Sequence, residues 1–331
     1  MYARECSLKL SPMKIALITP AAALARNGNR HTSARWAAML RALGHRVCVQ
    51  VSWDQKPADV MLALHARRSH DSIERFALAY PNRPLIVALT GTDLYRDIRF
   101  DADARQSMAL ATRMIVLQEM GLKELSVKHA AKTRVVYQSA AAIAPRPPLK
   151  NSFEVCVIGH LREEKDPLRA AMALAHMPAD SRIRVTQLGR SLHPELELEA
   201  RRVMAEDPHY HWLGEVPHWR AAQILARSRV MVISSRLEGG ANVVSEALMA
   251  NVPVIASRMS GNIGMLGENY PGYFPVSNER ALAKLLIRAE QDTDFYQSLK
   301  RSCRERKKII SAAREKSALK SLLREVGKSK T

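Results

Sequence analysis

The sequence is poor in aromatic residues and in cysteines, and both shortages restrict what the protein can be. Aromatic residues make up 5% of the 331 residues, so the cores must be aliphatic. An RNA-binding surface would need aromatic rings on which bases stack, and the basic segments lack such platforms. The cysteines stand far apart without C-x-x-C spacing, which predicts neither a zinc site nor a disulfide framework: Cys6, Cys48, Cys156 and Cys303. This pattern favours a reducing cytoplasm.

Long apolar runs are also missing from the sequence. No stretch reaches the roughly eighteen residues that a membrane-spanning helix needs. Residues 1–12 lack the apolar centre of a signal peptide, and the fold is expected to start near Met13. We therefore expect a cytoplasmic protein without stable membrane insertion, in which residues 1–12 form a disordered extension.

The net charge of +19 would suit an anionic partner such as nucleic acid, but its distribution weakens that interpretation. The last segment, 296–331, holds twelve Lys or Arg and three Glu, a net of +9. Within it Leu319, Leu322, Leu323 and Val326 recur at helical spacing, which predicts a basic amphipathic helix. Such a helix either packs its apolar stripe on the body of the protein or attaches to a membrane surface or RNA. We expect the first, and no nucleic-acid partner.

Short buried-strand patterns alternate with helical patterns along the chain, which predicts an α/β fold with parallel sheets. The predicted strands are 14–19, 46–52, 59–65, 85–90, 113–118 and 133–137, followed by 153–159, 182–188, 209–213, 229–235 and 252–257. Three prolines between residues 145 and 148 separate the two series and predict a linker over 145–152. The predicted domains are therefore 13–144 and 153–290, followed by a basic helical tail over 291–331.

The most informative stretch is 230–247, where a β-branched strand is followed by a glycine pair and the start of a helix. Gly239 and Gly240 let the backbone approach a ligand, and the free N–H groups of the helix that follows can bind an anion. Glu238 and Glu246, with seven residues between them, can accept hydrogen bonds from sugar hydroxyls. Together these features indicate a nucleotide-sugar site, although Glu246 taken alone would also fit an exposed helix residue.

Three loops that follow predicted strands of the first domain are rich in polar and cationic residues. They span 26–32, 65–69 and 90–95, and ligands of parallel α/β sheets bind at this carboxyl edge. Guanidinium and hydroxyl groups there suit an anion, while capping and turn formation is the alternative for each loop. The candidates for this anion-binding rim are Asn29, Arg30, Thr32, His65, Arg67, Arg68, Ser69, Thr90, Gly91, Thr92 and Asp93.

The segment 230–257 resembles the donor site of retaining glycosyltransferases with two Rossmann-like domains. In that family the first glutamate of an E-x7-E motif lies near the donor sugar and the second holds the ribose. The segment 159–167 is similar to the family's G-R-L-x-x-x-K pattern, with His160 in the usual arginine position and an arginine at Arg162 instead. The segment 213–217 resembles the one whose backbone meets the nucleotide base.

This resemblance implies an α/β fold of GT-B type, in which two Rossmann-like domains face a central cleft and a helical tail follows. It implies a UDP-sugar donor and three catalytic residues. Lys165 and Arg162 would neutralise the leaving diphosphate, and Glu238 would orient the sugar. The donor-binding residues that it implies are Val216, Glu238, Gly239, Gly240, Ala241, Asn242, Val243 and Glu246.

Five motifs together resemble a narrower group of this family, the selenosugar synthases (SenB) of selenoneine biosynthesis. They lie at 28–32, 64–69, 89–95, 159–167 and 261–273, and the resemblance covers roughly residues 13 to 290. It implies transfer of a sugar, N-acetylglucosamine, from a UDP-sugar to the selenium of selenophosphate. A small anionic acceptor fits the cationic rim better than a sugar acceptor, which would need aromatic platforms.

Several alternatives stay open at this point. The same two-domain fold suits a glycosyltransferase with another small-molecule or lipid acceptor, although a lipid would need an apolar entrance. It also suits a UDP-sugar epimerase or hydrolase. A basic RNA- or membrane-binding protein is the third class. Two D-x-D tripeptides, at 101–103 and 292–294, could hold a divalent ion, but each opens a predicted helix that its aspartate would cap. We expect no metal and no cofactor beyond the donor substrate.

Overall fold

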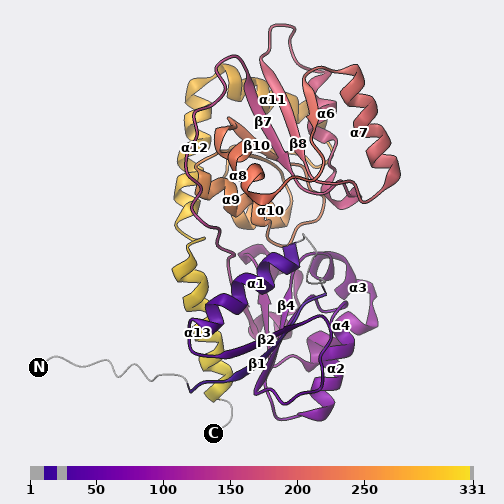
Figure 1. Ribbon diagram of the computed structural model, residues 1–331, viewed down its shortest axis with the longest axis vertical. Coiled ribbons are helices and arrows are strands. Elements are labelled where there is room, and N and C mark those ends of the chain that lie inside the picture. Colours follow the sequence, from indigo (N-terminus) through magenta and orange to yellow (C-terminus); the bar gives the residue numbers. More distant parts are fainter. Residues whose placement is uncertain (1–10, 21–27, 329–331) are drawn as a thin grey trace, which may run out of the picture. The chain divides into compact units, whose positions relative to one another are not determined.

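The structure is a computed structural model that describes residues 11–20 and 28–328 of the chain. The described residues form two six-stranded parallel sheets, each with helices packed against it (Figure 1). This arrangement confirms the predicted α/β fold with two Rossmann-like units. The expected disordered extension lies outside the described residues, apart from its last two positions.

The first sheet has the strand order β2-β1-β3-β4-β5-β6. Its strands are β1 (Lys14–Ile18), β2 (Arg46–Gln50), β3 (Val60–Leu64), β4 (Leu85–Leu89), β5 (Arg113–Val116) and β6 (Thr133–Val135). Every residue of β3 and β4 is buried, as expected for central strands with both faces covered. All six strands lie within the ranges predicted from the sequence.

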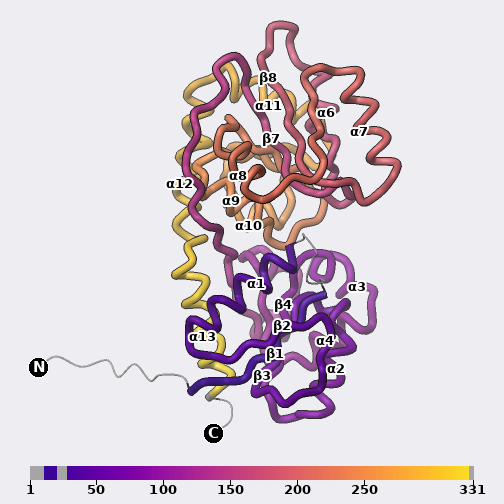
Figure 2. Tube along the Cα trace, in the orientation of Figure 1, coloured from indigo at the N-terminus to yellow at the C-terminus, as the bar shows by residue number. Residues whose placement is uncertain are grey.

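The helices of the first unit follow its strands in sequence, except for the last one. They are α1 (Gly28–Arg41), α2 (His70–Ala79), α3 (Ile98–Phe100), α4 (Ala102–Leu110), α5 (Val127–Ala131) and α13 (Ala312–Lys328), with a π-helical turn η1 (Asp93–Asp97). Figure 2 shows the yellow α13 beside the indigo start of the chain. The predicted apolar stripe of α13 is buried in the core of this unit, which confirms that it packs on the body.

The second sheet has the order β12-β11-β10-β7-β8-β9 and is again fully parallel. Its strands are β7 (Phe153–Ile158), β8 (Ile183–Leu188), β9 (Tyr210–Trp212), β10 (Val230–Ile233), β11 (Val254–Ser257) and β12 (Tyr273–Phe274). Its helices are α6 (Arg169–Leu174), α7 (Pro194–Glu206), α8 (His218–Arg227), α9 (Asn242–Ala250), α10 (Ser260–Leu266), α11 (Glu279–Gln291) and α12 (Thr293–Lys307), with the short turns η2 (Glu119–Glu124) and η3 (Glu163–Lys165).

The two compact units do not follow the predicted domain boundaries. The second unit contains 118–124 and 137–314, whereas 315–331 belongs to the first. One reason is the close packing of α10 against η2, where a Cβ on Gly264 would lie 1.8 Å from Oε1 of Gln118. The other is that α13 places Glu315 within 2.7 Å of the indole nitrogen of Trp36. Contacts between segments far apart in sequence thus set the limits of each unit.

Both D-x-D tripeptides begin helices, as predicted. The Asp101 side chain accepts a hydrogen bond from the Ala104 N–H at 2.8 Å, and the Asp292 side chain accepts one from the Phe295 N–H at 2.9 Å. No group of three or more metal-ligating side chains lies together within the described part of the chain. None of the described helices is both long and apolar enough to cross a membrane.

Candidate active site

Lys165 and Glu238 form an ion pair at the carboxyl edge of the second sheet. Their side chains are 23% and 14% exposed, so the pair is half shielded from water. The hydroxyl of Ser235 also donates to the Glu238 carboxylate, at 3.3 Å. Lys165 follows β7 and Glu238 follows β10, and these strands are neighbours in the sheet. The structure therefore brings together two of the three residues with predicted catalytic roles.

Backbone contacts between the two loops hold this pair in place. The Ser234 hydroxyl donates to the carbonyl oxygens of Lys165 and Asp166, at 3.1 and 2.8 Å. Asp166 adopts a left-handed φ of 45°, which turns the chain after Lys165. Its carboxylate accepts two hydrogen bonds from the Arg169 guanidinium, at 2.9 and 3.1 Å. The contacts of Ser234 join positions 68 and 69 residues apart, so no local motif could indicate them.

Helix α10 fixes the other side of the Glu238 loop. The buried Asn262 side chain donates to the Ser257 carbonyl at 2.9 Å, and the Ser257 hydroxyl donates to the Ser235 carbonyl at 2.6 Å. Gly261 lies against the Glu238 backbone with no room for a side chain. The segment 261–273 contributed to the family resemblance, and the structure shows that its first residues buttress the predicted donor loop.

Arg162 is the third residue with a predicted catalytic role. Its Nε is buried, and no hydrogen-bond partner for it exists among the described residues. Buried guanidinium nitrogens are almost always hydrogen-bonded, so an unpartnered one calls for an explanation such as a missing anionic ligand. Arg162 precedes η3, the turn that carries Lys165. Both cations thus come from one short loop.

Glu246 lies on the second turn of α9 and faces the start of α8. Its carboxylate is 3.3 Å from Nε2 of His218, and this hydrogen bond raises the pKa of His218 above its usual value. Glu246 is 23% exposed, so it is not the freely solvated residue that its type alone would suggest. Val216, predicted to lie near the base, precedes α8 and packs partly on the core. The structure thus brings Glu246 close to the predicted base segment.

The loop between Glu238 and α9 is closely packed. Gly239, Gly240 and Ala241 are buried, whereas Asn242 and Val243 are partly exposed at the first turn of the helix. Among the described residues no side chain caps α9. The N–H of Val244 in the first turn donates to the Ala241 carbonyl at 3.0 Å, and anion binding by the start of this helix stays a prediction.

Asp93 organises the rim of the first sheet. Its carboxylate is fully buried and accepts hydrogen bonds from the N–H groups of Ala66, Thr90 and Gly91, at 2.7 to 3.1 Å. These bonds tie the loop after β3 to the loop after β4. Asp93 therefore shapes the rim rather than presenting its carboxylate to a ligand, in contrast to its predicted role.

His65 lies at the centre of the same rim, in a left-handed conformation with φ of 73°. Its Nδ1 accepts the Arg68 N–H at 3.3 Å, and its Nε2 is 3.1 Å from the Thr92 hydroxyl. Burial lowers the pKa of His65, while the neighbouring Asp93 raises it to a smaller extent. The imidazole is therefore neutral near pH 7 and carries its proton on Nε2.

Arg67 is paired with a carboxylate that the sequence reasoning did not consider. Its Nε donates to Asp97 at 2.9 Å, and Arg96 donates to the same carboxylate at 3.1 Å. Asp97 ends the π-helical turn η1, an irregular element that often marks functional sites. Two nearby surface acids have other partners, since Asp71 accepts a hydrogen bond from Arg75 and Glu74 accepts one from Gln106.

The remaining rim candidates divide into two kinds. The Ser69 hydroxyl donates to the Leu64 carbonyl at 2.7 Å and the Thr32 hydroxyl to the Gly28 carbonyl at 2.9 Å, and both residues are buried. These two hydroxyls serve the backbone, because Thr32 lies inside α1 rather than at its start. Asn29 and Arg30 are partly exposed on the first turn of α1, and Arg68 is exposed. The first residues of the loop 26–32 lie outside the described residues.

Comparison with known proteins places the chain in a family. The model of the glycosyl transferases group 1 matches residues 140–315, more than half of the sequence, so the chain belongs to this family. That match covers the whole second sheet and every donor-site residue described above.

Solved glycosyltransferase structures share the complete fold. Sucrose-phosphate synthase from Thermosynechococcus elongatus superposes with a TM-score of 0.78 at 16% identity, covering 96% of this chain and 99% of its own. HepE of Anabaena, in complex with UDP and glucose, gives a TM-score of 0.75 at 16% identity, with coverages of 95% and 100%. A glycosyltransferase from Rickettsia africae gives 0.74 at 14% identity, with coverages of 96% and 99%. No curated protein matches the sequence. These likenesses confirm the GT-B fold expected from the sequence.

Proposed function

We propose that the protein transfers a sugar, N-acetylglucosamine, from a UDP-sugar to the selenium of selenophosphate. The observation that carries the donor half of this proposal is the ion pair between Lys165 and Glu238, with the buried Arg162 on the same loop. A donor diphosphate would take Lys165 and Arg162, and a sugar hydroxyl would take Glu238. The UDP bound in the similar HepE structure supports the choice of nucleotide.

In the proposed reaction the bond between the anomeric carbon and the diphosphate oxygen breaks, and its electron pair leaves with UDP. Lys165, Arg162 and the first turn of α9 stabilise the charge that develops on the leaving group. A selenium lone pair forms the new bond to the anomeric carbon. Water then cleaves the bond between selenium and phosphorus, which releases phosphate and leaves a 1-seleno-sugar.

The acceptor half of the proposal depends on the rim of the first unit. Arg30, Arg67 and Arg68 supply cationic groups, and the guanidinium fork matches the oxygens of a phosphate. Neutral His65 can donate from Nε2, to Thr92 or to an acceptor oxygen. Because selenophosphate is anionic and its selenium is already nucleophilic, the rim needs no general base and contributes mainly by positioning.

The direct test is mass spectrometry of the products formed from selenophosphate and a panel of nucleotide-sugars. We expect a seleno-sugar from UDP-N-acetylglucosamine, together with UDP and phosphate. Lys165→Ala should lower kcat/KM by about 100-fold or more, as expected when one group that stabilises the leaving charge is removed. The exposed Lys284→Ala provides the matched control and should behave as wild type.

The same assay separates the alternative functions. Release of UDP and free sugar without a new bond would indicate a hydrolase, and a changed nucleotide-sugar would indicate an epimerase. An oxygen acceptor used more efficiently than selenophosphate would overturn the proposed acceptor but would leave the donor site unchanged.

A further inference from the structure

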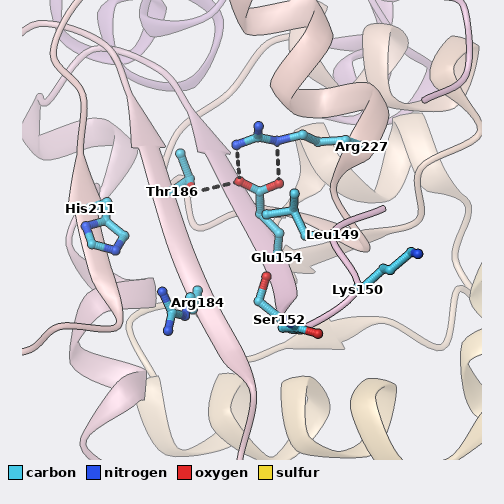
Figure 3. A pocket seen from close by; sticks show the side chains of 9 residues that line it. Leu149, Lys150, Ser152, Glu154, Arg184, Thr186, His211 and Arg227 are labelled. Atoms are coloured by element: carbon cyan, nitrogen blue, oxygen red, sulfur yellow. Dashed lines mark hydrogen bonds and ion pairs between the residues drawn. The ribbon is translucent and has the colours of Figure 1, made fainter. Parts of the chain in front are cut away.

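The second unit has a cavity of about 420 Å³ (Figure 3), and none of the donor-loop residues lines it. It opens over β7, β8 and β9. It lies near the amino end of β7, because Glu154 is the second residue of that strand. The donor loops instead follow the carboxyl ends of the strands, beyond Ile158 in β7. The residues that line the cavity are Leu149, Lys150, Asn151, Ser152, Glu154, Arg184, Thr186, His211 and Arg227.

Strand register explains why these side chains meet. Glu154 pairs with Arg184 across β7 and β8, and Thr186 pairs with His211 across β8 and β9. Side chains two residues apart on a strand share one face, so Arg184 and Thr186 point to the same side. The C-terminal residue of α8, Arg227, and the segment 149–152 complete the walls.

An exposed arginine is unusual at the position of Arg184. The strand β8 lies between β7 and β9, and both faces of an internal parallel strand are normally covered by helices. Arg184 is nevertheless the one exposed residue of β8, and His211 on β9 is exposed as well. Solvent therefore reaches this face of the sheet at Arg184 and His211, which are basic residues where apolar ones would be expected, while Thr186 on the same face is buried.

The single acid of the cavity is already neutralised. Glu154 is 3% exposed, and its two oxygens accept hydrogen bonds from Nε and Nη2 of Arg227 at 2.7 and 2.8 Å. The Thr186 hydroxyl donates to the same carboxylate at 3.0 Å. Both carboxylate oxygens are thus occupied, and Glu154 has little charge left to repel an anion.

The basic side chains of the cavity other than Arg227 have no such partners. Lys150, Arg184 and His211 make no side-chain hydrogen bond or ion pair with any other described residue. Figure 3 shows Arg184 and His211 on one side of Glu154 and Lys150 on the other. Lys150, Arg184 and Arg227 against Glu154 give the lining a net charge of +2.

We propose that this cavity is a further anion-binding site, separate from the donor loops and the rim, which takes a phosphorylated small molecule. Its volume is in the range of small-ligand pockets, and the guanidinium, ammonium and imidazole groups among its lining residues are the donors that phosphate oxygens prefer. The lining offers no Phe, Tyr or Trp on which a nucleic-acid base would stack, and Leu149 is its one large apolar residue. A compact phosphate ester or diphosphate therefore fits better than a nucleic acid or a membrane.

Calorimetric titration with inorganic diphosphate, on protein already saturated with UDP, tests this site separately from the donor site. We expect a further binding event, weakened about tenfold or more in the double variant Arg184→Ala/His211→Ala, since each charge-assisted hydrogen bond contributes at least that factor. Arg301→Ala removes an exposed arginine from α12 and serves as the control. If UDP does not bind, the same titration is run on Lys165→Ala without UDP.

Chemical labelling locates the site independently. Diphosphate should slow the acetylation of Lys150, measured by peptide mass spectrometry, and should leave Lys284 unaffected. The double variant should keep the wild-type melting temperature, because both side chains are exposed. The proposal is overturned if diphosphate does not bind at millimolar concentrations, if the double variant binds it like wild type, or if Lys150 is not protected. Displacement of diphosphate by a single-stranded oligonucleotide would also overturn it, in favour of a macromolecular ligand.

Discussion

Gly261 lies so close to the donor loop that a Cβ at this position would be 1.9 Å from the carbonyl oxygen of Glu238. Glycine is therefore required here by close approach of two backbones, and not by an unusual φ. A larger residue at position 261 would displace the backbone of Glu238. This would affect the site, because the Glu238 carboxylate pairs with Lys165.

Gly261→Ala should consequently shift the Glu238 loop. We expect a higher KM for the donor, a lower kcat, and a loss of about 1–3 kcal/mol of stability, which is typical of overpacking. Steady-state kinetics and thermal unfolding measure the two effects. A variant with wild-type donor kinetics would show that the position of this loop does not matter for turnover.

The second prediction concerns the attachment of α13 to the first unit. The buried Glu315 carboxylate accepts hydrogen bonds from Trp36 at 2.7 Å and from Arg35 at 3.0 Å. Glu315→Ala should reduce the stability of this unit by about 3–5 kcal/mol, because it removes the buried carboxylate that accepts hydrogen bonds from Trp36 and Arg35. Glu305→Ala, at an exposed position on α12, is the control. Urea unfolding compares the three proteins, and a loss below about 1 kcal/mol would contradict the anchoring role of Glu315.

The third prediction concerns pH and the donor site. The hydrogen bond that His218 donates to Glu246 raises the pKa of His218, so the ion pair is complete at low pH and is lost as pH rises through that raised pKa. If Glu246 holds the ribose, UDP binding must replace this partner and lower the pKa of His218. UDP should then bind more tightly as pH rises from 6 to 8, with release of a proton.

Calorimetry in buffers of different ionisation enthalpy counts that proton. Glu246→Gln should return the NMR titration of His218 towards its usual value of about 6.5. The same variant should weaken UDP binding by about 1.5–3 kcal/mol, the usual contribution of a charge-assisted hydrogen bond. Equal UDP affinity in variant and wild type would argue against a ribose contact.

The fourth prediction is that turnover needs no divalent cation. Asp101 and Asp292 both cap helices, and in the proposed function Lys165 and Arg162 supply the positive charge for the leaving diphosphate. Activity should persist in excess chelator. Asp292→Ala should cost about 0.5–2 kcal/mol of stability, the usual contribution of a helix cap, with little change in kcat. Complete loss of activity that magnesium restores would refute this prediction.

The fifth prediction tests the acceptor rim. Arg68→Ala and Arg67→Ala should each raise the KM for selenophosphate about tenfold, or lower kcat if the contact tightens only in the transition state. The affinity for the UDP-sugar should stay nearly unchanged. Arg105→Ala, exposed on α4 of the same unit, is the control. If both rim variants show wild-type kinetics, the acceptor must bind elsewhere.

The sequence by itself determined those features whose physical cause is local. Alternating strand and helix patterns located the first five strands of the second sheet and all six strands of the first. The spacing of Leu319 and Val326 identified the buried stripe of α13, and Asp101 and Asp292 were correctly read as caps. Periodicity and capping involve residues within a few positions of each other, so a single sequence is enough to predict them.

Only the tertiary structure decided how the polar residues of the two sites are used. Asp93, Ser69 and Thr32 looked like ligand groups, yet their oxygens bond to the protein backbone. Arg67 looked free for a ligand, yet Asp97 pairs with it across 30 positions. A loop residue can bind either a ligand or its own chain, and the choice depends on which distant donors and acceptors the fold brings within about 3 Å. No local pattern carries that information.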